Sequence, residues 1–140
     1  MKQIEILYQE LLQPSDALVA DMAKIKGDII ILGVGGKMGP GLARVAKQAV
    51  DKAGLKKRII GVARFSEAGL QQQLEAEGIE TISADLLDDE QLQALPTVEN
   101  VLYLAGTKFG TSGNESFTWA MNAYLPGRVA HRYRNSRIVA

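Results

Sequence analysis

The 140-residue sequence contains no cysteine, which excludes disulfides, thiolate metal sites and a cysteine nucleophile. It also has no excess of charge, because 16 Lys and Arg residues balance 16 Asp and Glu residues. No overall field therefore attracts nucleic acid or an anionic membrane, and we expect neither as a partner. The single histidine, His131, has no carboxylate or second histidine close to it in the sequence, so we expect no metal site.

Long hydrophobic runs are missing as well. No apolar stretch approaches the length of a membrane span, and the first ten residues, MKQIEILYQE, lack the apolar core of a signal peptide. These absences predict a cytoplasmic protein. The chain does have 46% hydrophobic residues, which is enough to bury the core of one globular domain.

The most informative stretch is residues 28–41, DIIILGVGGKMGPG, where four consecutive apolar residues run into closely spaced glycines. The apolar run predicts a strand buried on both faces, as in a parallel sheet. Gly33, Gly36 and Gly39 have the spacing G-x-x-G-x-x-G, and helical periodicity begins directly after them. Strand, glycine turn and helix predict a site for a dinucleotide pyrophosphate over Gly35–Met38; the alternative is a glycine-rich turn with no ligand.

Apolar periodicity predicts the elements of the whole chain. A helix is expected over residues 2–12 and a second between Ser15 and Gly27, which together form an N-terminal helical extension of residues 1–27. Strands and helices then alternate, with strands expected at 29–32, 58–63, 79–83, 100–105 and 137–140, and helices at 37–53, 66–77, 88–95 and 116–134. This alternation predicts an α/β domain over residues 28–140, a doubly wound parallel sheet (Rossmann fold) with strand order 3-2-1-4-5.

The glycine pattern resembles the nucleotide fingerprint of the extended short-chain dehydrogenases, the NAD-dependent epimerase/dehydratase family. Three later stretches are similar to that family: Asp85-Leu86 to the pair that borders the adenine, Leu104-Ala105-Gly106 to the small-residue turn beside the cofactor, and Asn122 to the helix asparagine. The resemblance covers residues 29–140. It implies the NAD(P)-binding part of an oxidoreductase that transfers hydride, often on a nucleotide sugar.

The predicted cofactor-binding residues are Gly33, Gly35, Gly36, Lys37, Met38, Gly39, Arg64, Asp85, Leu86, Leu104, Ala105, Gly106 and Asn122. Lys37 departs from the family, where an apolar or aromatic residue is usual. Its cation in the first turn of a helix opposes the helix dipole by roughly 0.3–1 kcal/mol, and a bound phosphate would reverse that sign. The alternative is a solvated surface lysine.

The end of the second strand bears on the choice of cofactor. NAD enzymes usually place an acid there to accept hydrogen bonds from the adenosine ribose, but here no acid occurs until Glu67. Arg64 is suited to pair with a 2′-phosphate instead, although an ordinary surface arginine is an equal alternative. NAD or NADP is therefore expected, with NADP slightly favoured.

The catalytic pair of the family, Tyr-x-x-x-Lys, is absent, because none of the four tyrosines is followed by a lysine four residues later. In the family that pair follows the fifth strand, where this chain ends. We therefore expect no catalytic residues here, cofactor binding without turnover, and the front part of a larger enzyme with a small-molecule substrate. The alternative is a stand-alone NAD(P)-sensing module that regulates a partner.

Two features of the C-terminal part lead to structural expectations. Pro126 cannot donate a hydrogen bond to the Asn122 carbonyl, so the long helix should be distorted between these residues. The apolar strand at residues 137–140 should leave one side unpaired. We expect a second copy of the chain, the N-terminal helices or a lattice contact to cover it, so a homo-oligomer is possible.

Overall fold

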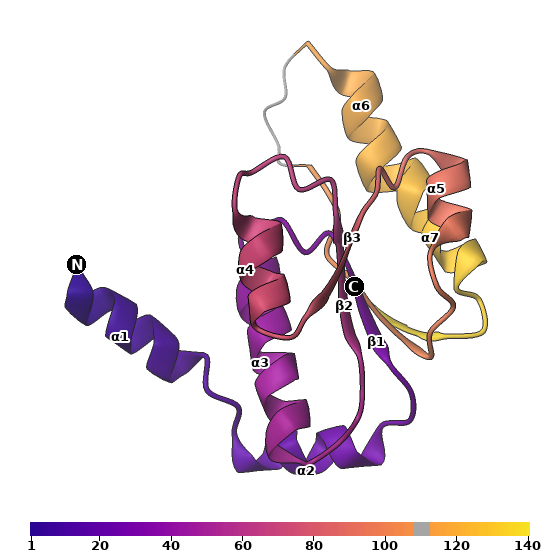
Figure 1. The fold of residues 1–140 in the computed structure, drawn as a ribbon. Helices are drawn as coiled ribbons and strands as arrows, with labels where there is room; N and C mark the ends of the chain where they lie inside the picture. Colours follow the sequence, from indigo (N-terminus) through magenta and orange to yellow (C-terminus); the bar gives the residue numbers. More distant parts are fainter. Residues whose placement is uncertain (108–112) are drawn as a thin grey trace.

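Figure 1 shows the computed structural model of the chain, which describes residues 1–107 and 113–140. The connection between the strand expected at 100–105 and the helix expected at 116–134 lies partly outside the described residues. The elements in chain order are α1 (Lys2–Leu11), α2 (Asp16–Lys24), β1 (Ile29–Leu32), α3 (Gly39–Lys52), β2 (Ile59–Ala63), α4 (Leu70–Ala76), β3 (Glu80–Ser83), α5 (Asp89–Ala94), β4 (Asn100–Tyr103), α6 (Glu115–Trp119), the π-helix η1 (Ala120–Tyr124), α7 (Leu125–Arg132) and β5 (Arg137–Val139).

The five strands form one parallel sheet in the order β3-β2-β1-β4-β5, so the predicted doubly wound Rossmann fold is confirmed. At its centre Ile30 pairs with Ile60 of β2 on one side and with Val101 of β4 on the other. The strand order reverses at this point, because β2 and β4 lie on opposite sides of β1. Their carboxyl ends meet at one edge, where α/β sheets place their ligands.

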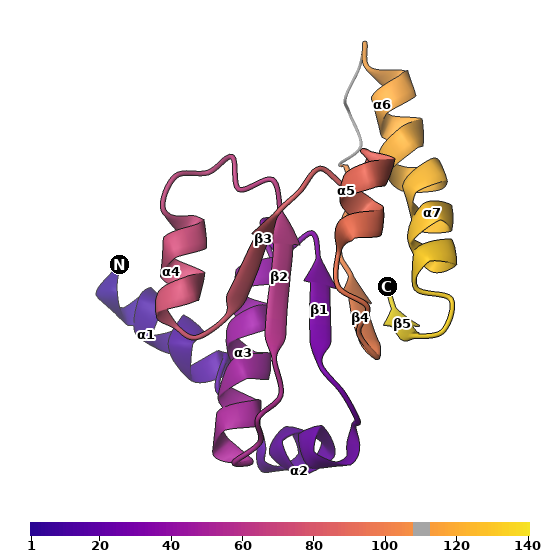
Figure 2. The ribbon, with the colours of Figure 1, turned by 45° about the vertical axis from the view of Figure 1, so that its right-hand side comes forward.

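Helices cover both faces of the sheet, α3 and α4 on one and α5 and α7 on the other (Figure 2). Strand β1 is buried on both faces, as its four apolar residues predict. Ile29 and Ile31 belong to the core under α3 and α4, whereas Ile30 and Leu32 belong to the core under α5 and α7. Each of these fully buried side chains contributes about 1.5–3 kcal/mol of stability.

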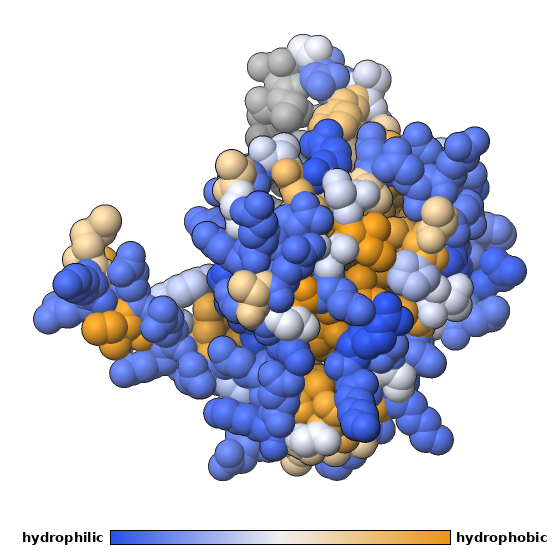
Figure 3. Space-filling view, in the orientation of Figure 1, coloured by the Kyte–Doolittle hydropathy of each residue, from blue (hydrophilic) through white to orange (hydrophobic). Residues whose placement is uncertain are grey.

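The N-terminal residues form the two expected helices. The Ser15 Oγ caps α2 by accepting a hydrogen bond from the Leu18 N–H at 3.1 Å. Met22 of α2 is buried in the core under α3, so α2 packs against the body. Helix α1 projects outward (Figure 1) but touches α3 at Gly41, where a Cβ would lie 3.1 Å from the Tyr8 hydroxyl. All ten residues of α1 are exposed, and apolar surface is visible on it in Figure 3. The division of the chain at residue 27 stays a prediction.

Two expected helix starts are wrong. Helix α4 begins at Leu70 rather than at residue 66. The chain turns at Phe65 (φ +52°) and again at Gly69 (φ +89°), and a right-handed helix can begin only after these left-handed residues. Helix α3 begins at Gly39 rather than at residue 37, and Met38 precedes it without a side-chain capping bond.

The expected distortion of the long helix is confirmed. Between α6 and α7 the chain forms the π-helix η1, in which the Leu125 N–H donates to the Ala120 carbonyl five residues earlier. The segment lies next to Pro126, which has no N–H to continue the regular ladder. All residues of β5 are exposed, so the N-terminal helices do not cover that strand, and a covering second copy stays a prediction. No helix among the described residues is long and apolar enough to cross a membrane.

Candidate functional site

The turn after β1 requires glycine at Gly33. Its φ of +91° lies in the left-handed region, and a Cβ there would lie 2.6 Å from the Ala105 backbone nitrogen. The N–H groups of Gly33 and Val34 both donate to the Val62 carbonyl, at 2.9 and 3.0 Å. Gly33 therefore lets the glycine turn pass close to the chain after β4, and the structure brings together two stretches that the sequence assigns to one site.

The other two glycines of the motif differ in what they contact. A Cβ on Gly39 would lie 2.2 Å from the Val34 carbonyl oxygen, so only glycine lets α3 start so close to the turn. A Cβ on Gly36 would come no closer than 3.6 Å, to the Gly33 oxygen, which is an ordinary contact. The fold thus requires Gly33 and Gly39 but has room for a side chain at Gly36. With glycine there, that room is open to a ligand.

The N-terminus of α3 faces this room without a capping side chain. The helix has 14 residues, Met38 makes no side-chain hydrogen bond to it, and its first turn contains no acid. Pro40 in that first turn has no N–H, so the free backbone donors there are those of Gly39 and Gly41, and the helix dipole favours an anion beside them. The side chains of Lys37 and Met38 are exposed beside the turn. Together with the open space at Gly36, these N–H groups form a cradle suited to a phosphate.

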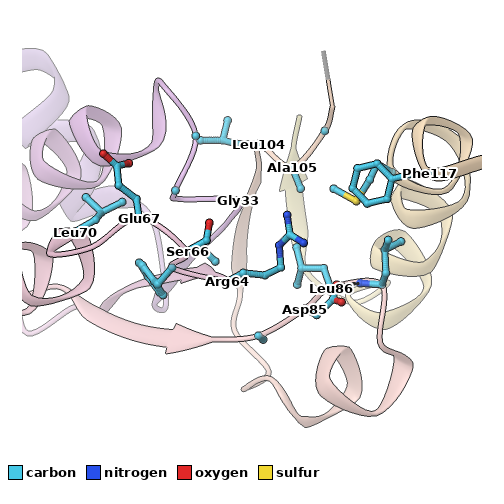
Figure 4. Close-up of a pocket in the computed structure, with 18 residues that line it drawn as sticks. Gly33, Arg64, Ser66, Glu67, Leu70, Asp85, Leu86, Leu104, Ala105 and Phe117 are labelled. Carbon is cyan, nitrogen blue, oxygen red and sulfur yellow. Dashed lines mark hydrogen bonds between the residues drawn. The ribbon is translucent and has the colours of Figure 1, made fainter. Parts of the chain in front are cut away.

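A cavity of about 290 Å³ opens from this cradle across the carboxyl ends of β1, β2 and β4 (Figure 4). It lies at the point where the strand order reverses, and it is lined by the following predicted residues: Gly33, Gly35, Gly36, Arg64, Asp85, Leu86, Leu104, Ala105 and Gly106. The other predicted residues lie outside this lining: Lys37, Met38, Gly39 and Asn122. The geometry assembles most of the predicted set around one space, while their binding roles stay predictions.

The wall after β2 carries Arg64 and Ser66. Figure 4 shows the Arg64 guanidinium extending into the cavity, which Ser66 also lines. Within the described part of the chain the guanidinium makes no ion pair, so its charge is available to a ligand. Glu67 also lines the cavity and is exposed, and it brings a negative charge to the same wall.

The wall after β3 is fixed by Asp85 and Leu86. The Asp85 carboxylate accepts a hydrogen bond from the Leu87 N–H at 3.0 Å, and the Asp85 N–H donates to the Gln91 side chain at 2.8 Å. Leu86 is 8% exposed and belongs to the core under α5 and α7. Asp85 thus shapes the loop, and Leu86 gives the cavity an apolar surface of the kind that an aromatic base requires.

Asn122 does not line the cavity but holds the loop that does. Its side-chain oxygen accepts from the Thr107 N–H at 2.9 Å, and its side-chain nitrogen donates to the Thr107 carbonyl at 3.1 Å. A Cβ on Gly106 would lie 3.4 Å from the same oxygen. The π-helix therefore directs Asn122 toward the chain that follows β4, and its effect on a ligand would be indirect.

Residues that the sequence did not indicate also line the cavity. They are Phe65, which follows Arg64, Phe117 of α6, which lies across the cavity from the β2 wall (Figure 4), and Met121 of η1. Phe117 and Met121 lie four residues apart, which is a helical spacing, but the π-helix shifts the register and hides which face points inward. Phe65 gave no signal, because the turn that it makes is unusual for its residue type.

Titratable groups elsewhere add little to the site. No group of three carboxylate or histidine side chains among the described residues could hold a metal ion. The Tyr103 hydroxyl on β4 is buried and has no hydrogen-bond partner in the described part of the chain. Burial raises the pKa of Tyr103 above its ordinary value, so that hydroxyl stays protonated at neutral pH.

Comparison with known proteins supports the fold. No protein-family model and no curated protein matches the chain. Among solved structures, the enzyme WbmF of Bordetella bronchiseptica, in complex with NAD+ and UDP, aligns with 84% of this chain at a TM-score of 0.61 and 15% identity, and the chain spans 35% of its length. The structure described as cmcI-D160 with Mg and SAM aligns with 74% of this chain and 44% of its own at a TM-score of only 0.42 and 18% identity, too low to support an argument. At 15% identity the first likeness shows the architecture alone, and that architecture is the Rossmann-like α/β fold.

Proposed function

We propose that this chain is the NAD(P)-binding part of an epimerase/dehydratase-type oxidoreductase that acts by hydride transfer. One observation carries the proposal: an uncapped helix N-terminus, a glycine with unused room and a 290 Å³ cavity meet where the strand order reverses. WbmF, which shares the fold, holds NAD+ in its structure. We propose a small molecule such as a nucleotide sugar as the substrate of the whole enzyme, and a cytoplasmic location.

The pyrophosphate belongs over Gly35–Met38 in this proposal. Its oxygens accept hydrogen bonds from the N–H groups of Gly39 and Gly41 in the first turn of α3, with Gly36 presenting no side chain to them. Lys37 is exposed at the same turn, and no ion pair is recorded for it in the described part of the chain. A phosphate there would offset the unfavourable placement of this cation near a helix N-terminus.

The adenosine half belongs in the cavity. The adenine lies against Leu86, beside the loop that Asp85 shapes, and the ribose faces Arg64. Two N–H donors of a guanidinium match the oxygens of a phosphate better than they match a ribose diol, which needs an acceptor. NADP is therefore favoured over NAD. The nearby Glu67 acts against this preference, so the preference depends on how far Arg64 reaches into the cavity.

The chain as given offers no acid–base pair for the hydride step. None of its four tyrosines has a lysine four residues later, and among residues 1–107 and 113–140 neither a tyrosine nor a lysine lines the cavity. The cofactor supplies the hydride chemistry, and these residues bind and orient it. The same observation favours the second candidate, a module that senses NAD(P) and regulates a partner without catalysis.

Calorimetric titration with NAD+, NADH, NADP+ and NADPH tests the proposal. We expect one site for each chain and tighter binding of the NADP forms. Absence of binding by all four dinucleotides would reject the proposal. Assaying hydride transfer to a nucleotide sugar, with this chain and with a longer one, then separates the two candidates, because only the enzyme gains activity when the chain is extended.

A further inference from the structure

Phe65 is the one residue other than glycine with a positive φ among residues 1–107 and 113–140. Its φ of +52° lies in the left-handed region, which is unfavourable for a residue with a Cβ. Such a conformation persists only where the surrounding structure imposes it, and these conformations occur mainly at functional sites. The residue lines the cavity, so this backbone conformation lies within the candidate site.

The ring of Phe65 faces the core, whereas the adjacent residues Arg64 and Ser66 face the cavity. The ring packs against the core under α3 and α4, which anchors the turn. Arg64 and Ser66, on either side of it, are exposed and line the cavity (Figure 4). In an extended strand Arg64 and Ser66 would share a face, but the chain must also leave the sheet here, since β2 ends at Ala63. The left-handed turn lets the chain leave while both side chains stay at the cavity.

The pair has the chemistry of a phosphate site. A guanidinium offers parallel N–H donors, a hydroxyl offers one more, and a phosphate monoester has three acceptor oxygens. The negative charge of Glu67, one residue beyond Ser66, opposes an anion at this wall. Selection of a phosphate therefore depends on Arg64 and Ser66 reaching the ligand while Glu67 does not, and this depends on the direction of the chain at Phe65.

We propose that Phe65 is a positioning residue for cofactor choice: its left-handed backbone holds Arg64 and Ser66 on one wall of the cavity, where they bind the 2′-phosphate of NADP. The inference rests on the proposed function, because it assumes that the cavity takes the adenosine half of the dinucleotide. It assigns no catalytic step to Phe65.

Two substitutions separate the backbone of Phe65 from its ring. Phe65→Pro fixes φ near −65°, so the left-handed turn is lost. The Phe65 N–H makes no hydrogen bond in the described part of the chain, so proline removes none. Phe65→Gly keeps the left-handed conformation but loses the ring. Phe65→Ile provides a second test of the backbone if the proline variant does not fold, because a β-branched residue strongly disfavours positive φ while retaining apolar bulk.

The measurement is the ratio of the NAD+ and NADP+ dissociation constants, with circular dichroism melting as the measure of folding. We expect Phe65→Pro to reduce the preference for NADP+ about tenfold or more, since it removes a charge-assisted contact, while NAD+ affinity changes less than about threefold. Phe65→Ile should act in the same direction. Phe65→Gly should melt earlier yet keep the ratio within about threefold of the parent.

A purely structural role predicts a different pattern, in which all variants lose both dinucleotides in proportion to their loss of stability. That pattern, or an unchanged ratio in the folded proline and isoleucine variants, would overturn the inference, as would a parent that binds both cofactors without preferring NADP+. In each of these cases a parent that binds dinucleotide leaves the proposed function intact. A parent that binds neither cofactor overturns the proposed function itself and this inference with it.

Discussion

The side-chain amide of Asn122 forms two hydrogen bonds with the backbone of Thr107, accepting from its N–H at 2.9 Å and donating to its carbonyl at 3.1 Å. The two residues are 15 positions apart, and Asn122 lies in a π-helix that breaks an otherwise continuous helical stretch. The pairing satisfies both backbone groups of the residue that follows the Leu104–Gly106 wall of the cavity. Cofactor affinity should therefore depend on Asn122 although its side chain lies outside the lining.

Replacing Asn122 with Asp tests this dependence. The carboxylate can still accept from the Thr107 N–H but cannot donate to the Thr107 carbonyl, so two acceptors face each other. We expect dinucleotide affinity to fall about tenfold, equivalent to roughly 1.4 kcal/mol, with faster hydrogen exchange around Thr107. Asn135→Asp, which makes the same charge change at an exposed site, should leave both measurements unchanged. Equal effects of the two substitutions would contradict the account.

The glycines of the motif should differ in how they affect stability. Gly39→Ala places a Cβ against the Val34 carbonyl and should cost about 3 kcal/mol or prevent folding. Gly36→Ala makes only an ordinary contact and should change the free energy of unfolding by less than about 1 kcal/mol. Urea unfolding measures both values. Similar losses of unfolding free energy for the two variants would show that the space around Gly36 is already filled by other residues.

Arg64 should set cofactor preference in solution. Its loss removes a charge-assisted hydrogen bond worth roughly 1.5–3 kcal/mol to the 2′-phosphate, so Arg64→Ala should narrow the preference for NADP by about tenfold or more. NAD affinity should change little. Lys56→Ala, at an exposed position before the amino end of β2 and so away from the cavity, serves as the control for lost positive charge. A parent that prefers NAD in calorimetry, or a preference that survives Arg64→Ala, would count against this role.

Tyr103 and Tyr133 should respond oppositely to loss of the hydroxyl. The buried Tyr103 hydroxyl has no partner in the described part of the chain, so Tyr103→Phe should stabilise the protein by about 1 kcal/mol. The Tyr133 hydroxyl donates to the Pro96 carbonyl at 3.0 Å, so Tyr133→Phe should destabilise it by a similar amount. Thermal melting of the two variants at neutral pH distinguishes them. If Tyr103→Phe did not stabilise the protein, the Tyr103 hydroxyl would have a hydrogen-bond partner after all.

The same tyrosine predicts a dependence on alkaline pH. Burial raises the pKa of Tyr103 in the folded state, so its neutral form is favoured there relative to the unfolded chain. This contribution is fully present below the unfolded pKa of about 10 and is lost as the pH rises through the folded value. Burial raises the pKa of Tyr133 as well. The free energy of unfolding should therefore fall above pH 10, and less steeply in Tyr103→Phe than in the parent.

The features that the sequence predicts correctly depend on local patterns with one structural solution. Four apolar residues in β1 fit only a strand buried on both faces, and Gly33 fits the left-handed turn that follows. Pro126 lacks an N–H and so predicts the break in the long helix. The strand order follows from these elements and the handedness of parallel crossovers.

The features that it misses are set by tertiary contacts. Ser66 follows a strand and precedes a helical pattern, which is typical of an N-cap, but the turn at Phe65 places it at the cavity. The inward placement of Met121 depends on the π-helix register. The partner of Asn122 is a backbone residue in a loop, and no pattern in the sequence connects the two. Local periodicity reports which residues are apolar, but not which wall of a cavity they reach.

The chain should bind dinucleotide without catalysing a reaction. The described residues that line its cavity include neither a tyrosine nor a lysine to exchange a proton with a substrate hydroxyl. We expect no detectable reduction or epimerisation of a nucleotide sugar when the 140-residue chain is saturated with NAD(P). Turnover at an ordinary enzymatic rate by this chain alone would contradict the assignment of its residues to cofactor binding.

The central claim is that a dinucleotide phosphate occupies the space over Gly36. Calorimetric titration of Gly36→Val with the preferred cofactor, beside the parent and with melting curves of both, tests it most directly. The account predicts one-to-one binding by the parent and no measurable binding by a variant that still folds, because the branched side chain fills the place of the phosphate. Unchanged affinity in a folded Gly36→Val protein would contradict the account.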